Sequence, residues 1–222
     1  MTTSKRPVGE PSPRWSHWLE RLLLIFPVVV GAGVVAALAK APVPGIQRAV
    51  LLGVGVAAVT IRVGIPVCLF LDARGFGDSD VSWAPSRYLY AAGALLVSAP
   101  LVALVYLYRR YEHVPPTVRG RYWWLAVATA AVIGPLTVLV GLFGTAATVG
   151  TVLAVAATVT AGLLPVGIHR DAAFVRRSRY RWNPNPALYL GIAFLCLLVA
   201  VLQPLLALGY LGKRYRARST RE

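Results

Sequence analysis

Acidic residues are scarce in this chain. Its 222 residues include 8 Asp and Glu against 23 Lys and Arg, and charged residues make up only 14% of the total. Hydrophobic residues make up 57%, more than a soluble domain of this size can bury. We therefore expect most of the chain to lie in a lipid bilayer. This placement excludes nucleic acid as the partner of the basic residues, and anionic lipid headgroups are the expected partner.

Catalytic and metal-binding motifs are also missing. The sequence has no HExxH, no phosphate-binding P-loop, no cysteine cluster and no Ser/His/Asp set, so we expect a protein that is not an enzyme and holds no metal or other cofactor. His17, His113 and His169 lie at the edges of apolar segments, which disfavours a haem held by two histidines. Cys68 and Cys196 lie in separate apolar segments, so we expect buried free thiols.

Long apolar segments occupy most of the sequence. Each is about 20 residues or more, which as a helix crosses a hydrocarbon core of about 30 Å. Backbone groups in lipid must pair within their own segment, so helices are expected. The sequence therefore predicts an all-α, multi-pass integral protein of the cell membrane with six transmembrane helices. The predicted spans cover residues 21–40, 48–71, 88–108, 122–143, 145–168 and 187–211.

The second half of the chain repeats the first. Proline, aspartate, tryptophan and tyrosine recur at one shared offset of 99 positions, which indicates an internal duplication. The stretch 100–110 also returns as 204–214, with 7 of 11 positions identical. The positions matched at the first offset are Pro66 and Pro165, Asp72 and Asp171, Trp83 and Trp182, Pro85 and Pro184, and Tyr90 and Tyr189.

The repeat predicts the domain organisation. We expect a disordered tail over residues 1–13, repeat 1 over 14–113, repeat 2 over 114–214 and a basic tail over 215–222. Each predicted span carries one proline, and these pair between the repeats as Pro27 with Pro135, Pro66 with Pro165, and Pro100 with Pro204. The loop 40–48 is present only in repeat 1 and accounts for the change of offset from 108 to 99.

Three spans per repeat predict an inverted topology. An odd number of crossings would place Trp83 and Trp182 on opposite faces of the membrane, related by a two-fold axis in the membrane plane. The Lys and Arg residues then divide equally between the two faces. Such a balance gives no orientation by the positive-inside rule, and the dense basic C-terminus favours termini on the inner face.

Arg62 is the one charged residue deep inside a predicted span. No Asp or Glu lies within any span, so we expect carbonyl groups freed by a kink, water, an anion or the amide of Gln203 as its partners. An intramembrane arginine costs about 2.5–3.5 kcal/mol on insertion scales, so it should face a polar interior. Arg62 and Gln203 are thus candidates for a transport pathway or for a buried structural polar site.

Asp72 and Asp171 end the second and fifth spans. A carboxylate at a helix C-terminus opposes the helix dipole and favours a nearby cation. Under the inverted topology Asp72 shares a face with Arg214, and Asp171 shares a face with Arg110. We therefore expect two ion pairs between the repeats, either structural or part of a gate.

Trp83 and Trp182 each precede a predicted span and are followed by proline. Tryptophan favours the headgroup level and proline favours a helix start, so we expect interfacial anchors. The Trp-x-Pro start and the later Tyr-Leu-Tyr-Arg-Arg-Tyr-Glu-His113 resemble uncharacterised multi-pass membrane proteins of halophilic archaea. The resemblance covers mainly 72–113, with a weaker counterpart over 171–214, and implies a membrane location without implying an activity.

Two functional hypotheses remain open from the sequence. The first is a small channel or transporter for an anion or small solute, with Arg62 near the path. The second is a non-catalytic membrane subunit that anchors or stabilises a larger complex, or a homo-oligomer. A polar cavity that reaches Arg62 would favour the first, and an Arg62 bonded within the protein would favour the second.

Overall fold

The computed structural model describes residues 13–38, 44–77, 79, 81–116, 120–143, 147–178, 181–199 and 202–219. Within these ranges the structure describes the backbone alone for residues 30–38, 46, 47, 137, 138, 141–143, 147–158, 218 and 219, and for Pro13 and Pro44. All the regular structure of the described residues is helical, which confirms the predicted all-α class. The predicted tail over 1–13 lies outside the described residues, apart from Pro13, which begins the first helix.

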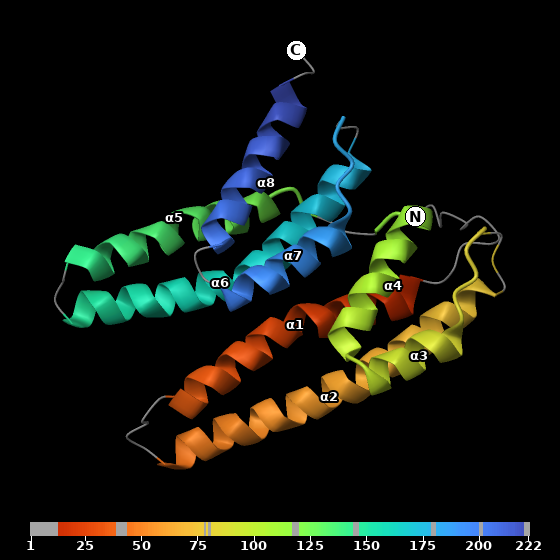
Figure 1. The fold of residues 1–222 in the computed structure, drawn as a ribbon, viewed down its shortest axis with the longest axis horizontal. Helices are drawn as coiled ribbons and strands as arrows, with labels where there is room; N and C mark the ends of the chain where they lie inside the picture. The colour runs from red at the N-terminus through yellow and green to blue at the C-terminus, as the bar shows by residue number, and fades with distance from the viewer. Residues whose placement is uncertain are drawn as a thin grey trace, which may run out of the picture. The chain divides into compact units, whose positions relative to one another are not determined.

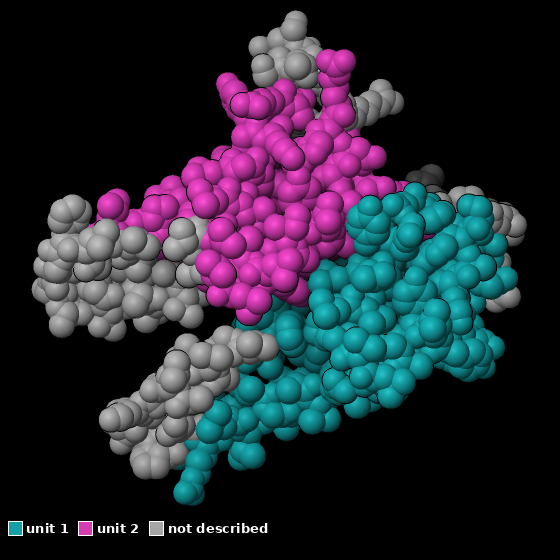
Figure 2. Space-filling view, in the orientation of Figure 1, with its two compact units in different colours: residues 1–113 teal, residues 114–222 magenta. Residues whose placement is uncertain are grey.

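The chain divides into two compact units, residues 1–113 and 114–222 (Figure 2). Each contains two long helices followed by two shorter ones (Figure 1). Unit 1 holds α1 (Pro13–Leu38), α2 (Pro44–Phe76), α3 (Arg87–Leu96) and α4 (Ala99–His113), and unit 2 holds α5 (Trp123–Phe143), α6 (Ala147–Arg177), α7 (Pro186–Leu198) and α8 (Leu202–Ser219). Residues 215–219, predicted as part of a tail, belong to α8.

The two long helices of each unit pack side by side. In unit 1 the buried face of α1 contributes Leu19 and Leu23, and that of α2 contributes Ile65 and Leu69. In unit 2 the core cluster includes Val127 of α5 and Leu164 of α6. The sequences of these helices are apolar on all sides over most of their length. One side of each helix packs against its partner, and the other side leaves apolar residues exposed. Prolines inside these four helices leave them unbroken: Pro27, Pro66, Pro135 and Pro165.

The predicted spans 88–108 and 187–211 are wrong as continuous helices. In unit 1 the helix ends at Leu96 and a new one begins at Ala99. Ser98 accepts the first backbone hydrogen bond of α4, from the N–H of Val102 at 3.0 Å. Pro100 follows directly, and a proline that is favourable in a first helical turn cannot continue a helix from before it. In unit 2 the corresponding break lies between α7 and α8.

The two short helices of unit 1 form a returning hairpin. A straight helix from residue 87 to residue 113 would be about 39 Å long. The rings of Trp83, just before α3, and His113, at the end of α4, instead stack with their centres 5.4 Å apart. The chain therefore runs down along α2 as α3, turns at Val97 and Ser98, and comes back as α4 (Figure 1).

Unit 2 returns in the same way. The ring of Trp182, before α7, lies 5.3 Å from that of Tyr210 in α8. Since α7 and α8 both pack against α6, and α8 also packs against α5, the second hairpin closes over the end of the long helix pair.

One described helical stretch, Arg48–Phe76, is long and apolar enough to cross a membrane by itself, with a mean hydropathy of 2.2 over its best window. Two shorter apolar stretches, Trp123–Leu136 and Pro186–Leu197, accompany it. Large apolar side chains are exposed along α2, including Leu52, Val56 and Val59. These features are consistent with a helical protein that associates with a membrane.

Candidate functional site

Each unit contains a buried aspartate held by one tyrosine and one arginine. In unit 1 the hydroxyl of Tyr106 donates to Asp72 Oδ2 at 2.8 Å, and Arg110 Nε donates to the same oxygen at 2.8 Å. The side chain of Asp72 is fully buried and that of Arg110 is 3% exposed. Tyr106 and Arg110 lie four residues apart, on one face of α4, so this bond set fixes the end of α4 against the end of α2.

Unit 2 repeats the tyrosine and arginine bonds of this arrangement. Tyr210 donates its hydroxyl to Asp171 Oδ2 at 2.8 Å, and Arg214 Nε donates to that oxygen at 2.7 Å. Asp171 is again fully buried, whereas the side chain of Arg214 is 14% exposed. A buried carboxylate is tolerated when a cation and further donors satisfy it. We call these two sets the Asp72 cluster and the Asp171 cluster.

The predicted partners of the two aspartates are wrong. Asp72 pairs with Arg110 and Asp171 pairs with Arg214, each within its own unit. The expectation of pairing between repeats depended on a continuous third span, which would carry Arg110 to the far end of the unit. Because the chain turns back at Val97, Arg110 returns to the end at which Asp72 lies.

The aspartates have one oxygen each left over. Asp72 Oδ1 and Asp171 Oδ1 are buried and make no hydrogen bond of ordinary geometry. Arg110 Nη2 is also buried without such a hydrogen bond. Buried polar atoms of this kind are costly unless an ordered water satisfies them. Each cluster therefore neutralises its charge internally while one oxygen of its carboxylate is left without a hydrogen bond of ordinary geometry.

Aromatic rings surround both clusters. The ring of Trp83 lies 5.3 Å from Tyr106 and 5.1 Å from Phe76, and Tyr90 lies 5.0 Å from Tyr106. In unit 2 the equivalent three rings are Trp182, Tyr189 and Tyr210, with centres 5.1–5.7 Å apart. Trp83 and Trp182, predicted as interfacial anchors, thus pack onto the returning helices. Tyr106 and Tyr210, which the sequence analysis did not single out, are both buried donors to a carboxylate.

Unit 1 has an additional buried acid. Glu20 of α1 is 2% exposed, and its Oε1 accepts a hydrogen bond of 2.7 Å from the hydroxyl of Tyr111. Tyr111 follows Arg110 in α4, so this bond ties α4 to α1 as the Asp72 cluster ties it to α2. Neither Glu20 nor Tyr111 stood out in the sequence, because Glu20 precedes the first predicted span.

Arg62 satisfies the end of a helix. Its Nη2 donates to the backbone carbonyl of Leu95 at 2.7 Å. Leu95 lies in the last turn of α3, where carbonyl groups have no partner further along the helix. A cation at this end also opposes the negative pole of the helix dipole. A carbonyl partner was expected, but this one is freed by the end of α3 and not by a kink. The expectation that Arg62 faces a polar interior is wrong, because its side chain is exposed.

A small cavity of about 140 Å³ borders Arg62, lined by residues of α1, α2 and α4. Its other lining residues are apolar, so it is not a continuous polar channel. Gln203, the other candidate pathway residue, is buried near the start of α8 in unit 2. Arg62 and Gln203 therefore belong to different units. Arg62 bonds to a carbonyl of unit 1, and Gln203 is buried within unit 2.

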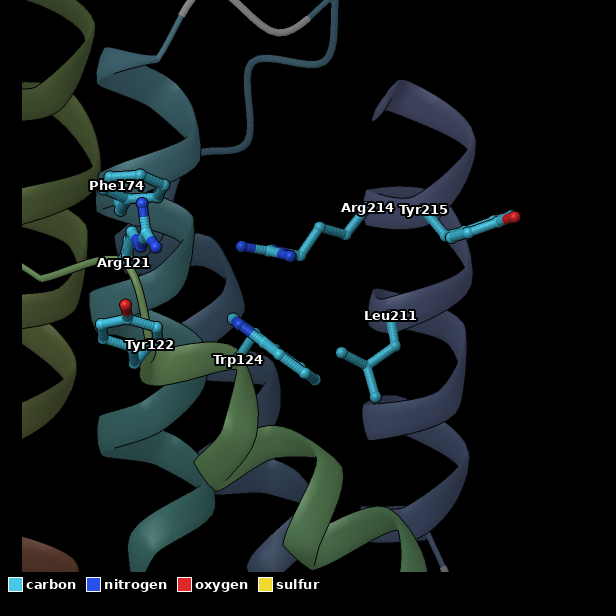
Figure 3. A pocket seen from close by; sticks show the side chains of 7 residues that line it. All are labelled: Arg121, Tyr122, Trp124, Phe174, Leu211, Arg214 and Tyr215. Atoms are coloured by element: carbon cyan, nitrogen blue, oxygen red, sulfur yellow. The ribbon is translucent and has the colours of Figure 1, made fainter. Parts of the chain in front are cut away.

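A larger pocket lies beside the Asp171 cluster (Figure 3). It has a volume of about 670 Å³. Its walls are the start of α5 with the two residues before it, the C-terminal part of α6, and the last part of α8. Its lining residues are Arg121, Tyr122, Trp124, Phe174, Leu211, Arg214 and Tyr215.

Among the described residues, no group of His, Cys, Asp and Glu side chains is suited to hold a metal ion. Comparison with protein-family models, curated proteins and solved structures found no match to this chain.

Proposed function

We propose that the chain is an integral membrane protein built from two copies of one unit, each with two crossing helices and one re-entrant helical hairpin. The support is geometric. The 10 residues of α3 span about 15 Å, half of a hydrocarbon core, before the chain turns. The turn lies level with Arg62, about 15 Å along α2 from Asp72. The membrane is then crossed four times, in place of the six crossings predicted from the sequence.

This proposal replaces the inverted topology with a parallel one. Two crossings per unit return the chain to its starting face, so Trp83 and Trp182 lie on the same side. Every Lys and Arg except Lys40, Arg48 and Arg62 then belongs to that side, 20 of the 23 in the chain. So strong an asymmetry follows the positive-inside rule and assigns both termini and both hairpin openings to the cytoplasm.

The geometry best supports a non-catalytic membrane subunit that anchors or stabilises a larger assembly. The observation that carries this proposal is the bond from Arg62 to the Leu95 carbonyl. The residue that would have lined a transport path instead closes a helix end. Asp72 and Asp171 are likewise neutralised inside their units. The polar side chains thus hold the hairpins in place.

A channel or transporter is the second candidate. The observation in its favour is the pair of broken helices, since half-helix ends within a bilayer form the ion and solute sites of many transporters. The ends of α3 and α7 would both lie near the middle of the membrane. In unit 2 no arginine fills this place, because Ala161 stands at the position of Arg62.

Flux measurements separate the two candidates. The purified protein, reconstituted in liposomes, is tested for the passage of chloride, nitrate and small neutral solutes, with protein-free liposomes as the control. The subunit proposal predicts no flux above the control. Flux that depends on the protein and changes in Arg62→Gln or Gln203→Leu would overturn that proposal in favour of the transporter.

A further inference from the structure

The pocket beside the Asp171 cluster has the chemistry of an anion site with an apolar floor. Arg214 points from α8 across the cavity, and Arg121 reaches into it from the segment before α5 (Figure 3). Nε of Arg214 is bonded to Asp171, and Arg214 also lines the pocket. None of the lining residues is acidic. Two guanidinium groups that face one space favour a doubly accepting anion such as phosphate.

The rest of the lining is apolar and aromatic. Trp124 and Leu211 lie beneath the two arginines, and the guanidinium carbon of Arg214 is 5.9 Å from the centre of the Trp124 ring. A free inorganic anion would leave this surface in contact with water. A phosphate that carries an apolar chain would cover it, and burial of apolar area adds to affinity.

Unit 1 has a buried carboxylate at a position where unit 2 has alanine. The proline pairing Pro27–Pro135 puts Ala128 at the position of Glu20, and the pairing Pro100–Pro204 puts Tyr215 at that of Tyr111. Glu20 and Tyr111 are buried and bonded to each other, whereas Tyr215 is 75% exposed. Unit 2 therefore keeps the arginine of its cluster but lacks the neighbouring acid.

We propose that the pocket binds the phosphate headgroup of an anionic phospholipid, with the phosphate between Arg121 and Arg214. The proposal rests on the membrane placement argued above, which puts the pocket at the cytoplasmic headgroup level. A soluble phosphate ester would meet the same two arginines, so the test must distinguish the two sources.

The test uses the full chain, purified in detergent and equilibrated with phosphatidylglycerol or phosphatidylcholine. Retained lipid is counted by native mass spectrometry. A second arm titrates inorganic phosphate and follows the thermal unfolding of the protein. Arg121→Gln removes one guanidinium from the pocket. Ala128→Glu introduces the carboxylate of unit 1 on α5, about one helical turn from Trp124, which lines the pocket. Arg109→Gln is the matched control, because it removes one charge from the proposed cytoplasmic side of unit 1.

The wild type and Arg109→Gln should retain phosphatidylglycerol in preference to phosphatidylcholine. Arg121→Gln should weaken retention about tenfold, the effect of one lost charge-assisted hydrogen bond, and Ala128→Glu should abolish it. Stabilisation by inorganic phosphate that equals the effect of the lipid would support the phosphate site and contradict the lipid source. Equal retention of both lipids with no response to phosphate would overturn the site, as would an Arg121→Gln variant that matches Arg109→Gln.

A poorly folded Ala128→Glu variant leaves the decision to Arg121→Gln, whose side chain is exposed. The result is also separable from the proposed function. Flux through liposomes would contradict the subunit proposal without bearing on the pocket. An empty pocket in a protein that conducts nothing would contradict the lipid site alone.

Discussion

Two donors share one oxygen of each buried aspartate. Removing the negative charge of that carboxylate leaves the positive charge of the arginine without a counter-ion. Asp72→Asn should destabilise the protein by about 3–5 kcal/mol, the usual cost of breaking a buried ion pair from one side. Asp171→Asn should cost less, because the side chain of Arg214 is 14% exposed and that of Arg110 is 3% exposed. Unfolding in detergent micelles measures both.

The double variant Asp72→Asn with Arg110→Gln is the control for this prediction. It removes the unpaired charge and should recover part of the lost stability. If Asp72→Asn were as stable as the wild type, the Asp72 cluster would not be what holds α4.

Arg62 is expected to matter for stability and not for transport. Arg62→Gln shortens the side chain and removes the charge at the end of α3, so the free energy of unfolding should fall by about 0.5–1.5 kcal/mol, the net value of one hydrogen bond. Arg48→Gln removes the same charge from another exposed position, near the start of the same helix and far from the end of α3, and should change little. Equal stability of the two variants would show that the bond to Leu95 contributes nothing.

For single residues, the sequence identified the residues that form the clusters better than it identified which of them contact one another. The shared offset identified both aspartates and both tryptophans, and the helix-dipole argument correctly asked for a cation near each aspartate. The partners could not be assigned, because Arg110 pairs with Asp72 only if the chain between them turns back. The tyrosine donors were hidden since Tyr106 and Tyr210 also fit a membrane belt.

Among the elements, the long helix pairs approach closely at two glycines. A Cβ atom added at Gly167 of α6 would lie 2.9 Å from the Cβ of Ala126 in α5, whereas one added at Gly64 of α2 would lie 2.8 Å from the flexible end of Leu22. Gly167→Ala should therefore destabilise by about 1–3 kcal/mol through overpacking. Gly64→Ala is the matched comparison and should cost less, because Leu22 can change rotamer; thermal unfolding of the two variants decides.

The returning hairpin has its own test. Gly77→Cys, at the end of α2, and Glu112→Cys, at the end of α4, should both react with a membrane-impermeant thiol reagent from the same side. Cys68 and Cys196 are replaced by alanine in the parent protein, and Ser98→Cys, at the turn within the membrane, should resist the reagent from either side. Reaction of the first two positions from opposite sides would mean that α3 and α4 form one crossing helix after all.

The breaks in the third segments were missed for a physical reason. All six spans contain a proline, and four of these prolines lie inside intact helices. Proline alone therefore does not distinguish a kink from a break. The useful signal was Ser98 two residues before Pro100, a serine at a helix start with proline in the first turn. In unit 2 no serine precedes the corresponding proline. The break there could have been predicted only from its repeat relation to unit 1.

For the whole molecule, the parallel topology makes a prediction opposite to that of an inverted repeat. Gly77→Cys and Arg177→Cys, next to the two tryptophan loops, should react from the cytoplasmic side only. Arg48→Cys, near the start of α2, should react from the other side. The reason is the even number of crossings in each unit together with the distribution of basic residues. Labelling of the two tryptophan loops from different sides would restore the inverted arrangement.

The short length of α3 also bears on how the protein is made. Its 10 residues are too few for the translocon to recognise as a membrane segment, and the carbonyl of Leu95 near its end is bonded by a side chain of a neighbouring helix. Under the proposed topology, the hairpin of α1 and α2 would therefore enter the bilayer first and offer Arg62 and Asp72 as docking points. Because these bonds all lie within residues 1–113, unit 1 can finish its insertion while unit 2 is still on the ribosome.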